Sequence, residues 1–411
     1  MPGPGMDIIG EEEKQELLEV IESGYLYRYG NTDDPKFKAK VWNLERSFAN
    51  KLGSKYGLAV NSGTSALLTS LWALGISPGD EVIVPGYTFI ASITSIIFAR
   101  GIPVLAEVDK TLTLDPMDVK RKISSKTKAI MLVHMLGNPG HIDEIKQIAE
   151  DYDLIFIEDC AQALGATYKG KSVGTYGDMG AFSLNVYKTI TAGDGGMVIT
   201  DDEKLYERAF AIHDQGHLPL RQGVEQGKRT ILGLNFRMNE LTAAVANAQL
   251  NKLDKIKTKL AQNKSLLKNR LKETEEIEFR EILDKEGDAG TLLTFFMPSK
   301  KSAIKLAKKL NCVRISESGW HVYNNMEHLL GKMTVTDEKC PFVCPLHDIG
   351  EVDYEKGMLP QTDDLLERGI NISVGVSDPG LGSAFGVKIN STEQEIIDAA
   401  ETLKRAIKSS L

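Results

Sequence analysis

The chain has 411 residues, of which 42% are hydrophobic and 26% charged, and its formal net charge is -8. This composition is typical of a globular protein with one large core and a second, smaller one, and the acidic balance argues against a protein that binds nucleic acid phosphates. The four cysteines are too irregularly spaced for a disulfide framework, and neither a secretory signal nor a membrane-spanning stretch is visible, so we expect a cytoplasmic protein.

Short β-rich runs alternate with helical runs from about residue 47 to residue 200. The β-rich runs are GLAV (57–60), EVIVPG (81–86), PVLAEVD (103–109), AIMLVHM (129–135) and LIFIED (154–159). Helical runs begin near Ser62, Ala91 and Ile142. This alternation predicts an α/β fold with a mostly parallel sheet and helices on both faces. Ligands of such sheets bind at the carboxyl ends of the strands.

The segment NSGTSALLTSL (61–71) directly follows the first apolar run. A strand that ends in a Gly-Thr-Ser turn and opens a helix presents free backbone N–H groups and hydroxyls, and the helix dipole adds to their attraction for an anion. This segment therefore predicts a phosphate site. The alternative interpretation is that Ser62 or Thr64 only caps the helix.

An acidic pair, Glu158 and Asp159, ends the hydrophobic run in LIFIEDCAQALG (154–165). A carboxylate at the carboxyl end of a strand is placed to face a ligand. Acidic residues are also ordinary at strand ends, where they belong to turns. The pair is therefore a candidate ligand contact with a plain structural alternative.

A single lysine, Lys188, interrupts the β-rich segment AFSLNVYKTITAGDGGMVIT (181–200) and precedes its glycine-rich turn. Apolar neighbours on both sides predict burial. Burial lowers the pKa of a lysine, which suits the formation of a Schiff base. The alternative is a structural ion pair.

The rest of the chain has a different character. A polar insertion spans residues 217–229, and residues 238–261 keep an apolar helical period. A lysine-rich segment with a helical pattern follows. The later segments are the β-rich TLLTFFMP (291–298) and the helical KSAIKLAKKL (301–310) and EQEIIDAAETLKRAIKSSL (393–411). We therefore predict a large domain over residues 1–255 and a small α+β domain over residues 256–411.

The turn, the carboxylate and the lysine together match the needs of a pyridoxal cofactor. These needs are an anion cradle, a partner for the ring nitrogen and an amine that forms a Schiff base. With the match densest over residues 59–244, the chain resembles the sugar aminotransferases of the DegT/DnrJ/EryC1/StrS family. The resemblance implies the type I fold of pyridoxal-phosphate-dependent transferases, bound pyridoxal 5'-phosphate, and amino transfer from glutamate to a keto or aldehyde sugar.

The resemblance also implies roles for single residues. In NVYKTIT (185–191) Lys188 is similar to the Schiff-base lysine that also moves protons, and in EDCAQALG (158–165) Asp159 is similar to the partner of the pyridine nitrogen. The other implied cofactor contacts are a polar contact from Gln162, ring stacking from Phe89, and a phosphate cradle of Gly63, Thr64 and Ser183.

A cross-subunit contact is implied as well. Asn235 in GLNFRMNELTAA (233–244) is similar to the asparagine that the family extends to the partner's phosphate, which implies a homodimer with shared active sites. Two positions depart from the family pattern, Asp194 where Glu is usual and Cys160 where Ala is common, and neither removes a functional group. Relatives that dehydrate sugars carry histidine in place of Lys188, so this lysine favours amino transfer.

Five stretches of the sequence are informative about the substrate: LVHMLG (132–137), HDQGHLP (213–219), the loop to GLNFRMNE (233–240), EFREILDKEGDAG (278–290) and GWHVYNNMEH (319–328). They are similar to family members that make 8-amino-3,8-dideoxy-manno-octulosonate from the 8-oxo sugar acid, for lipopolysaccharide. The polar loop with His217, Arg221, Lys228 and Arg229 suits the carboxylate of a sugar acid, and it suits a nucleotide diphosphate or plain solvent contact equally. Trp320 and His321 are expected either to line the sugar pocket or to pack in the core.

Three rival functions are weaker. A nicotinamide-dependent oxidoreductase needs a glycine fingerprint, and the nearest match, GLGSAFG (380–386), has the wrong final spacing. Cys340, Cys344 and His347 form an incomplete zinc motif without a fourth ligand nearby. A non-catalytic regulator that senses the cofactor would need a DNA-reading element, which the acidic chain does not show.

Overall fold

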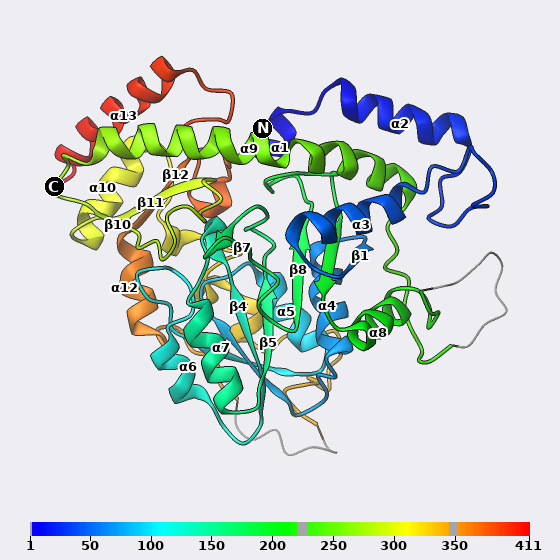
Figure 1. The fold of residues 1–411 in the computed structure, drawn as a ribbon. Coiled ribbons are helices and arrows are strands. Elements are labelled where there is room, and N and C mark those ends of the chain that lie inside the picture. The colour runs from blue at the N-terminus through cyan, green and yellow to red at the C-terminus, as the bar shows by residue number, and fades with distance from the viewer. Residues whose placement is uncertain (1, 220–228, 345–351) are drawn as a thin grey trace.

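The computed structural model describes residues 2–219, 229–344 and 352–411 (Figure 1). Its centre is a seven-stranded sheet in the order β1-β9-β8-β5-β4-β2-β3. These strands are β1 (Tyr56–Val60), β2 (Glu81–Pro85), β3 (Ile102–Ala106), β4 (Thr127–Val133), β5 (Ile155–Asp159), β8 (Met179–Ser183) and β9 (Gly196–Thr200). Neighbouring strands pair in parallel along β3, β2, β4, β5 and β8, and β9 pairs antiparallel with β8 and β1. The predicted mostly parallel α/β sheet is confirmed.

Helices cover both faces of this sheet because successive side chains of a strand point to opposite faces. In β4, Ile130 and Leu132 belong to a core with α3 (Lys40–Leu52), α7 (Ile142–Asp151) and α9 (Glu240–Leu271). The intervening Ala129 and Met131 belong to a second core with α4 (Gly63–Ala73), α5 (Ile90–Phe98) and α8 (Glu203–His213). Both faces are apolar, which explains why the strands read as nearly continuous hydrophobic runs.

A second, antiparallel sheet in the order β10-β11-β12 follows later in the chain. It consists of β10 (Glu278–Phe279), β11 (Leu292–Phe296) and β12 (Gly369–Ser373), and the helices α10 (Lys300–Leu310), α12 (Pro360–Arg368) and α13 (Glu393–Lys408) belong to the same part of the chain. Figure 1 shows α9 running beside α13 at one end and toward α2 (Glu11–Ser23) at the other. The domain division that we propose at residue 255 falls inside this continuous helix.

The remaining elements are short. They are the helices α1 (Pro4–Asp7), α6 (Pro116–Lys122) and α11 (Glu327–Leu330), the strands β6 (Thr167–Tyr168) and β7 (Lys171–Ser172), and the 3-10 turns η1 (Met135–Gly137), η2 (Ile315–Glu317), η3 (Tyr323–Asn325) and η4 (Pro379–Leu381). A bridge between Tyr87 and Val322 ties the segment before η3 to the carboxyl end of β2. Among the described residues, no helix combines the length and apolarity needed to cross a bilayer.

Candidate active site

A cavity of about 630 Å³ lies at the carboxyl ends of the strands of the large sheet. Its walls come from the turn between β1 and α4, the segment that enters α5, the ends of β5 and β8, and loops near residues 320 and 378. This volume is within the range of small-ligand pockets. The cavity therefore lies where the alternating fold predicts a ligand site.

The turn between β1 and α4 contributes Ser62, Gly63 and Thr64 to the cavity wall. Ser62 Oγ accepts a hydrogen bond from the backbone N–H of Ser65 at 3.0 Å, so Ser62 is indeed a helix cap. Gly63 approaches Ser183 so closely that a Cβ at position 63 would lie 2.7 Å from the Ser183 Cβ. Glycine therefore keeps the helix N-terminus and the Ser183 side chain together at the cavity wall, where both can contact an anion.

Asp159 is the last residue of β5, and its side chain is buried at the cavity wall. Ser92 Oγ donates a hydrogen bond to Asp159 Oδ2 at 2.7 Å, and the backbone N–H of Ala161 donates to Oδ1 at 3.0 Å. Neither donor carries a charge. Burial raises the pKa of Asp159, and the Ser92 hydrogen bond and the charge of Lys188 oppose this shift. Such a carboxylate suits a ligand that presents a protonated nitrogen.

Lys188 lies in the loop between β8 and β9, half-buried at the wall of the same cavity. Burial lowers the pKa of Lys188, and the charges of Asp159 and Asp378 act in the opposite direction. In the described ranges Lys188 takes part in no ion pair within 4.0 Å. The alternative interpretation, a structural ion pair of Lys188, is therefore not supported there. An amine with a lowered pKa that faces a cavity is suited to act as a nucleophile and as a base.

An aromatic pair and an amide complete the lining near these groups. The Phe89 ring is 40% exposed, and its centroid lies 5.3 Å from that of the His321 ring. Burial, followed by the charge of Lys188, lowers the pKa of His321 to about 3, so this side chain is neutral near pH 7. Gln162 Oε1 accepts a hydrogen bond from the backbone N–H of Leu136 at 3.0 Å. All three side chains line the cavity.

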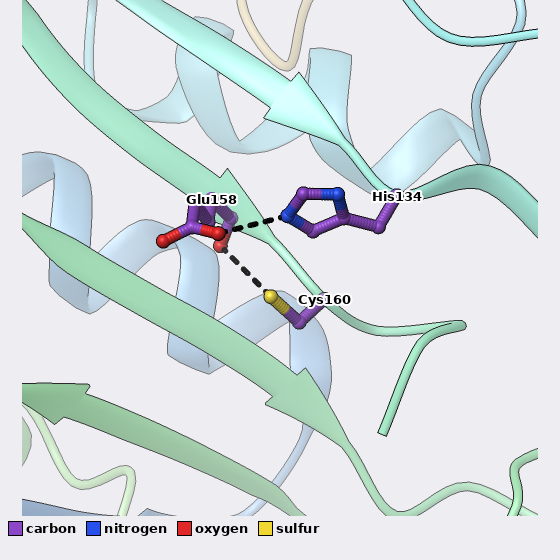
Figure 2. Close-up of side chains that lie close together, drawn as sticks. All are labelled: His134, Glu158 and Cys160. Atoms are coloured by element: carbon purple, nitrogen blue, oxygen red, sulfur yellow. Dashed lines mark hydrogen bonds and ion pairs between the residues drawn. The ribbon is translucent and has the colours of Figure 1, made fainter. Parts of the chain in front are cut away.

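Glu158, the residue before Asp159, does not line the cavity and lies close to His134 and Cys160 (Figure 2). His134 Nδ1 accepts the backbone N–H of Gly140 at 3.1 Å, so the ring proton lies on Nε2, which donates to Glu158 Oε2 at 2.9 Å. Backbone N–H groups of residues 174, 176 and 177 also donate to the Glu158 carboxylate. Burial alone would raise the pKa of Glu158. The His134 contact and these backbone donors outweigh burial, and the pKa of Glu158 is lowered overall.

The same group is the one place in the described part of the chain where three potential metal ligands come together. Cys160 joins it, with its Sγ 3.9 Å from the Glu158 backbone oxygen (Figure 2). A metal ion would have to displace the Nε2 proton of His134 and the backbone donors of Glu158. The hydrogen bonds of Glu158 hold the end of β5 to the segment over residues 174–177, and they account for this group without a metal ion.

The residues predicted to bind the sugar are divided by the structure. Trp320 and His321 line the cavity, and Trp320 is 59% exposed. His217 and Arg229 do not belong to its lining, and His217 is buried with its Nδ1 2.6 Å from the Asp214 carbonyl oxygen. Arg221 lies outside the described residues, and so do Lys228 and His347. Cys340 is exposed and Cys344 half-buried.

Asn235 does not belong to the cavity lining of its own chain. It is exposed, it forms a bridge with Asp214, and its Oδ1 accepts the backbone N–H of Arg237 at 3.3 Å. The cross-subunit role therefore stays a prediction.

Sequence reasoning missed several polar residues of the cavity wall, among them Thr88, Ser92 and Asp378. In the sequence Ser92 is one serine of an apolar helical segment. The periodicity of that segment does not predict which strand the face with Ser92 packs against. Asp378 stands in a Ser-Asp-Pro-Gly turn, and its Oδ1 does accept the backbone N–H of Gly380 at 2.8 Å. The sequence of this turn predicts the hydrogen bond between Asp378 and Gly380, and it gives no indication that Asp378 also lines a cavity.

The comparison with known families identifies the chain. Residues 7–341 match the DegT/DnrJ/EryC1/StrS aminotransferase family. An uncharacterised protein of Methanocaldococcus jannaschii, MJ1066, is 30% identical over 426 residues, which cover 98% of this chain and 97% of that protein. The chain therefore belongs to the DegT/DnrJ/EryC1/StrS aminotransferase family.

Named relatives match over a shorter part of the chain. GDP-perosamine synthase of Escherichia coli O157:H7 is 40% identical over 244 residues, which cover 59% of this chain and 64% of that protein. The matches to the GDP-perosamine synthases of Vibrio cholerae and Caulobacter vibrioides span 65% and 62% of those proteins. The chain thus matches just under two thirds of the length of these relatives.

Solved structures share the whole fold. An aminotransferase from Psychrobacter cryohalolentis is 27% identical with a TM-score of 0.79, and the match covers 100% of this chain and 99% of that one. An E. coli GDP-4-keto-6-deoxy-D-mannose-3-dehydratase, whose structure holds hydrated PLP, is 22% identical with a TM-score of 0.79, over 98% of this chain and 99% of that one. At this identity the second likeness concerns the fold alone.

Proposed function

We propose that this chain, as a member of the DegT/DnrJ/EryC1/StrS aminotransferase family, holds pyridoxal 5'-phosphate on Lys188 and transfers an amino group to a ketosugar. The observation that carries this proposal is a shared cavity: the helix N-terminus at Gly63, the carboxylate of Asp159 and the amine of Lys188 all line it. These groups match the phosphate, the ring nitrogen and the aldehyde of the cofactor.

The residues present fit this cofactor. Asp159 is a buried carboxylate whose two hydrogen-bond donors are neutral, so a protonated ring nitrogen would supply the missing positive charge. A Cβ at position 63 would push against Ser183, whose hydroxyl we expect at the phosphate. The exposed face of Phe89 offers a surface for ring stacking. Thr64, Ser183 and Gln162 would complete the set from the same cavity wall.

When bound, the cofactor supplies an electron sink for the carbon that loses or gains the amino group. Lys188 Nζ would hold it covalently and, once an amino donor has displaced it, would accept and return a proton. The lowered pKa of Lys188 increases the unprotonated fraction of Nζ that this base role needs. Asp159 would keep the ring nitrogen protonated. His321, neutral beside Phe89, adds no charge that competes with either group.

L-glutamate is the proposed amino donor, and a nucleotide-linked ketosugar is the proposed acceptor. GDP-perosamine synthases are among the relatives, which supports this acceptor. In the described cavity wall Lys188 is the one Lys or Arg side chain, beside the carboxylates of Asp159, Asp194 and Asp378. The sugar ring of a nucleotide-linked substrate is uncharged and suits this wall, whereas its diphosphate would have to bind outside these lining residues. The preference over a free sugar acid therefore rests on the relatives. The 8-oxo-3,8-dideoxy-manno-octulosonate suggested by five sequence stretches is therefore the second acceptor to test.

A visible spectrum of the purified protein tests the cofactor and the donor. After incubation with pyridoxal phosphate and gel filtration, we expect a visible absorption band that disappears on addition of glutamate, as 2-oxoglutarate is released. Mass spectrometry after borohydride reduction should place the cofactor on Lys188. A protein that stays colourless would overturn the proposal. A coloured protein that does not react with glutamate would instead support a cofactor-binding regulator, or a different donor if another amino acid bleaches the band.

The acceptor is tested on the same glutamate-treated protein. A GDP-linked ketosugar should restore the visible band and yield an aminosugar, whereas the free 8-oxo octulosonate should not. If the octulosonate restores the band and the nucleotide-linked sugar does not, the proposed acceptor is wrong while the aminotransferase proposal stands.

Asn235→Ala should weaken retention of pyridoxal phosphate about tenfold, because a hydrogen bond to the charged phosphate of the partner's site is lost. Equilibrium dialysis measures this loss, with the exposed Asn269→Ala in α9 as the matched control.

A hybrid of Lys188→Ala and Asn235→Ala chains distinguishes the two possible arrangements. Activity is measured at a pyridoxal phosphate concentration that loads the intact site but not a site without Asn235. If Asn235 serves the partner's site, the hybrid dimer contains one intact site and is active under this condition. If Asn235 serves its own site, both sites stay defective, and a hybrid without activity would count against the shared site.

A further inference from the structure

A relay of two hydroxyl groups leads from Asp159 to the start of α5. Ser92 Oγ lies 2.7 Å from Asp159 Oδ2, and Thr88 Oγ1 lies 2.6 Å from Ser92 Oγ. Both hydroxyl side chains are buried, with exposed fractions of 1% for Ser92 and 0% for Thr88. Bulk water therefore cannot replace either contact at low cost.

The direction of the relay follows from its end point. An ionised carboxylate only accepts hydrogen bonds, so the single proton of the Ser92 hydroxyl points to Asp159. Ser92 must then accept from Thr88, whose own proton points to Ser92. The other acceptor near Thr88 Oγ1 is the Phe89 carbonyl oxygen at 3.5 Å, which is too far for a good hydrogen bond.

The far end of the relay is held by the segment that passes the cavity wall near residue 320. The backbone N–H of Thr88 donates to the His321 carbonyl oxygen at 3.0 Å, and the backbone N–H of Ile90 donates to that of Trp320 at 2.8 Å. These bonds fix the backbone on which Thr88 and Ser92 stand. The relay is thus anchored to a segment more than two hundred residues away in the chain.

We propose that Ser92 is a positioning residue, which with Thr88 behind it keeps Asp159 ionised and aimed at the ring nitrogen of the cofactor. This inference rests on the proposed function, because Asp159 matters to the cofactor only if pyridoxal phosphate binds here. The Ser92 hydrogen bond stabilises the charged form of a carboxylate that burial destabilises. Two other titratable side chains also lower the pKa of Asp159: Lys188, from the loop after β8, and His134, from the end of β4. Both are unchanged in the variants below.

The test uses the apo protein titrated with pyridoxal phosphate over a range of pH. Ser92→Ala should lower the affinity about tenfold, because a hydrogen bond to a charged group is lost. Without this donor the pKa of Asp159 rises, so binding should fail at a higher pH on the acid side than in the unsubstituted protein. Thr88→Val should shift the acid-side midpoint in the same direction by less. Thr88→Ser, which keeps the hydroxyl, should bind as the unsubstituted protein does.

Ser95→Ala is the matched control. Ser95 is a buried serine of the same helix, and its Oγ donates to the Ser92 carbonyl oxygen at 3.0 Å, so its loss costs a buried hydroxyl without touching Asp159. Equal affinity and equal pH midpoints for Ser92→Ala and Ser95→Ala would overturn the inference. If Ser92→Ala does not fold by circular dichroism, the comparison of Thr88→Val with Thr88→Ser decides in its place. Absence of binding by the unsubstituted protein would reject the proposed function itself.

Discussion

Lys188→Ala should lose both the visible cofactor band and the half-reaction with glutamate, and amino transfer should slow by about 10⁴-fold. The loss is large because one amine would both hold the cofactor and move the proton. The fold should survive, because Lys188 takes part in no ion pair among the described residues. Single-turnover absorbance measurements and a urea denaturation curve measure these two expectations separately.

Two further variants sharpen this experiment. Lys188→Arg keeps the positive charge beside Asp159 but should be equally inactive, because a guanidinium stays protonated and forms no Schiff base. Lys204→Ala removes an exposed lysine of α8 and should leave both readouts unchanged. Glutamate turnover by Lys188→Ala would remove this lysine from its proposed role.

Asp159→Asn should reduce amino transfer by about 10³-fold, because the amide cannot hold the ring nitrogen protonated. The apo protein, however, should not lose stability. Burial raises the pKa of Asp159 in the folded state, so stability falls as pH rises through that pKa, and at neutral pH the ionised group is a net cost. The amide carries no such cost, and its Nδ2 can donate to Ser92 Oγ.

Urea denaturation at neutral and acidic pH checks the stability of Asp159→Asn against the unsubstituted protein. The difference in unfolding free energy should favour the variant at neutral pH and shrink at acidic pH, where Asp159 is protonated. Asp153→Asn is the control, since it removes an exposed carboxylate just before β5, at the opposite end of the strand from Asp159. An Asp159→Asn protein with unchanged amino transfer would contradict the proposed partner of the ring nitrogen.

The alternation of strands and helices in the large sheet could be predicted from the sequence. Its strands are buried on both faces and read as short apolar runs, so their existence follows from composition and spacing alone. The placement of β9, antiparallel between β1 and β8, could not be predicted in this way. Strand order depends on which edges pair in three dimensions, and local periodicity carries no record of that pairing.

Glu158 and Asp159 show the same limit at the site. Both end the same hydrophobic run, and both qualified as ligand contacts by position. The pleat of β5 sends their side chains to opposite faces, so Asp159 reaches the cavity and Glu158 reaches His134 and a set of backbone donors. Which of two adjacent acids meets the ligand depends on the register of the strand against its neighbours.

What the sequence by itself determined was the local chemistry: the Gly63 turn, the strand-end acid and Lys188 each carry their signal within a few neighbouring residues. Only the tertiary structure decided that Ser92 meets Asp159, 67 residues away, and that His321 lies beside Phe89. The physical reason is packing. A motif is written along the chain, whereas contacts between distant segments depend on how helix faces and strand registers fit together, and that fit is a property of the whole core.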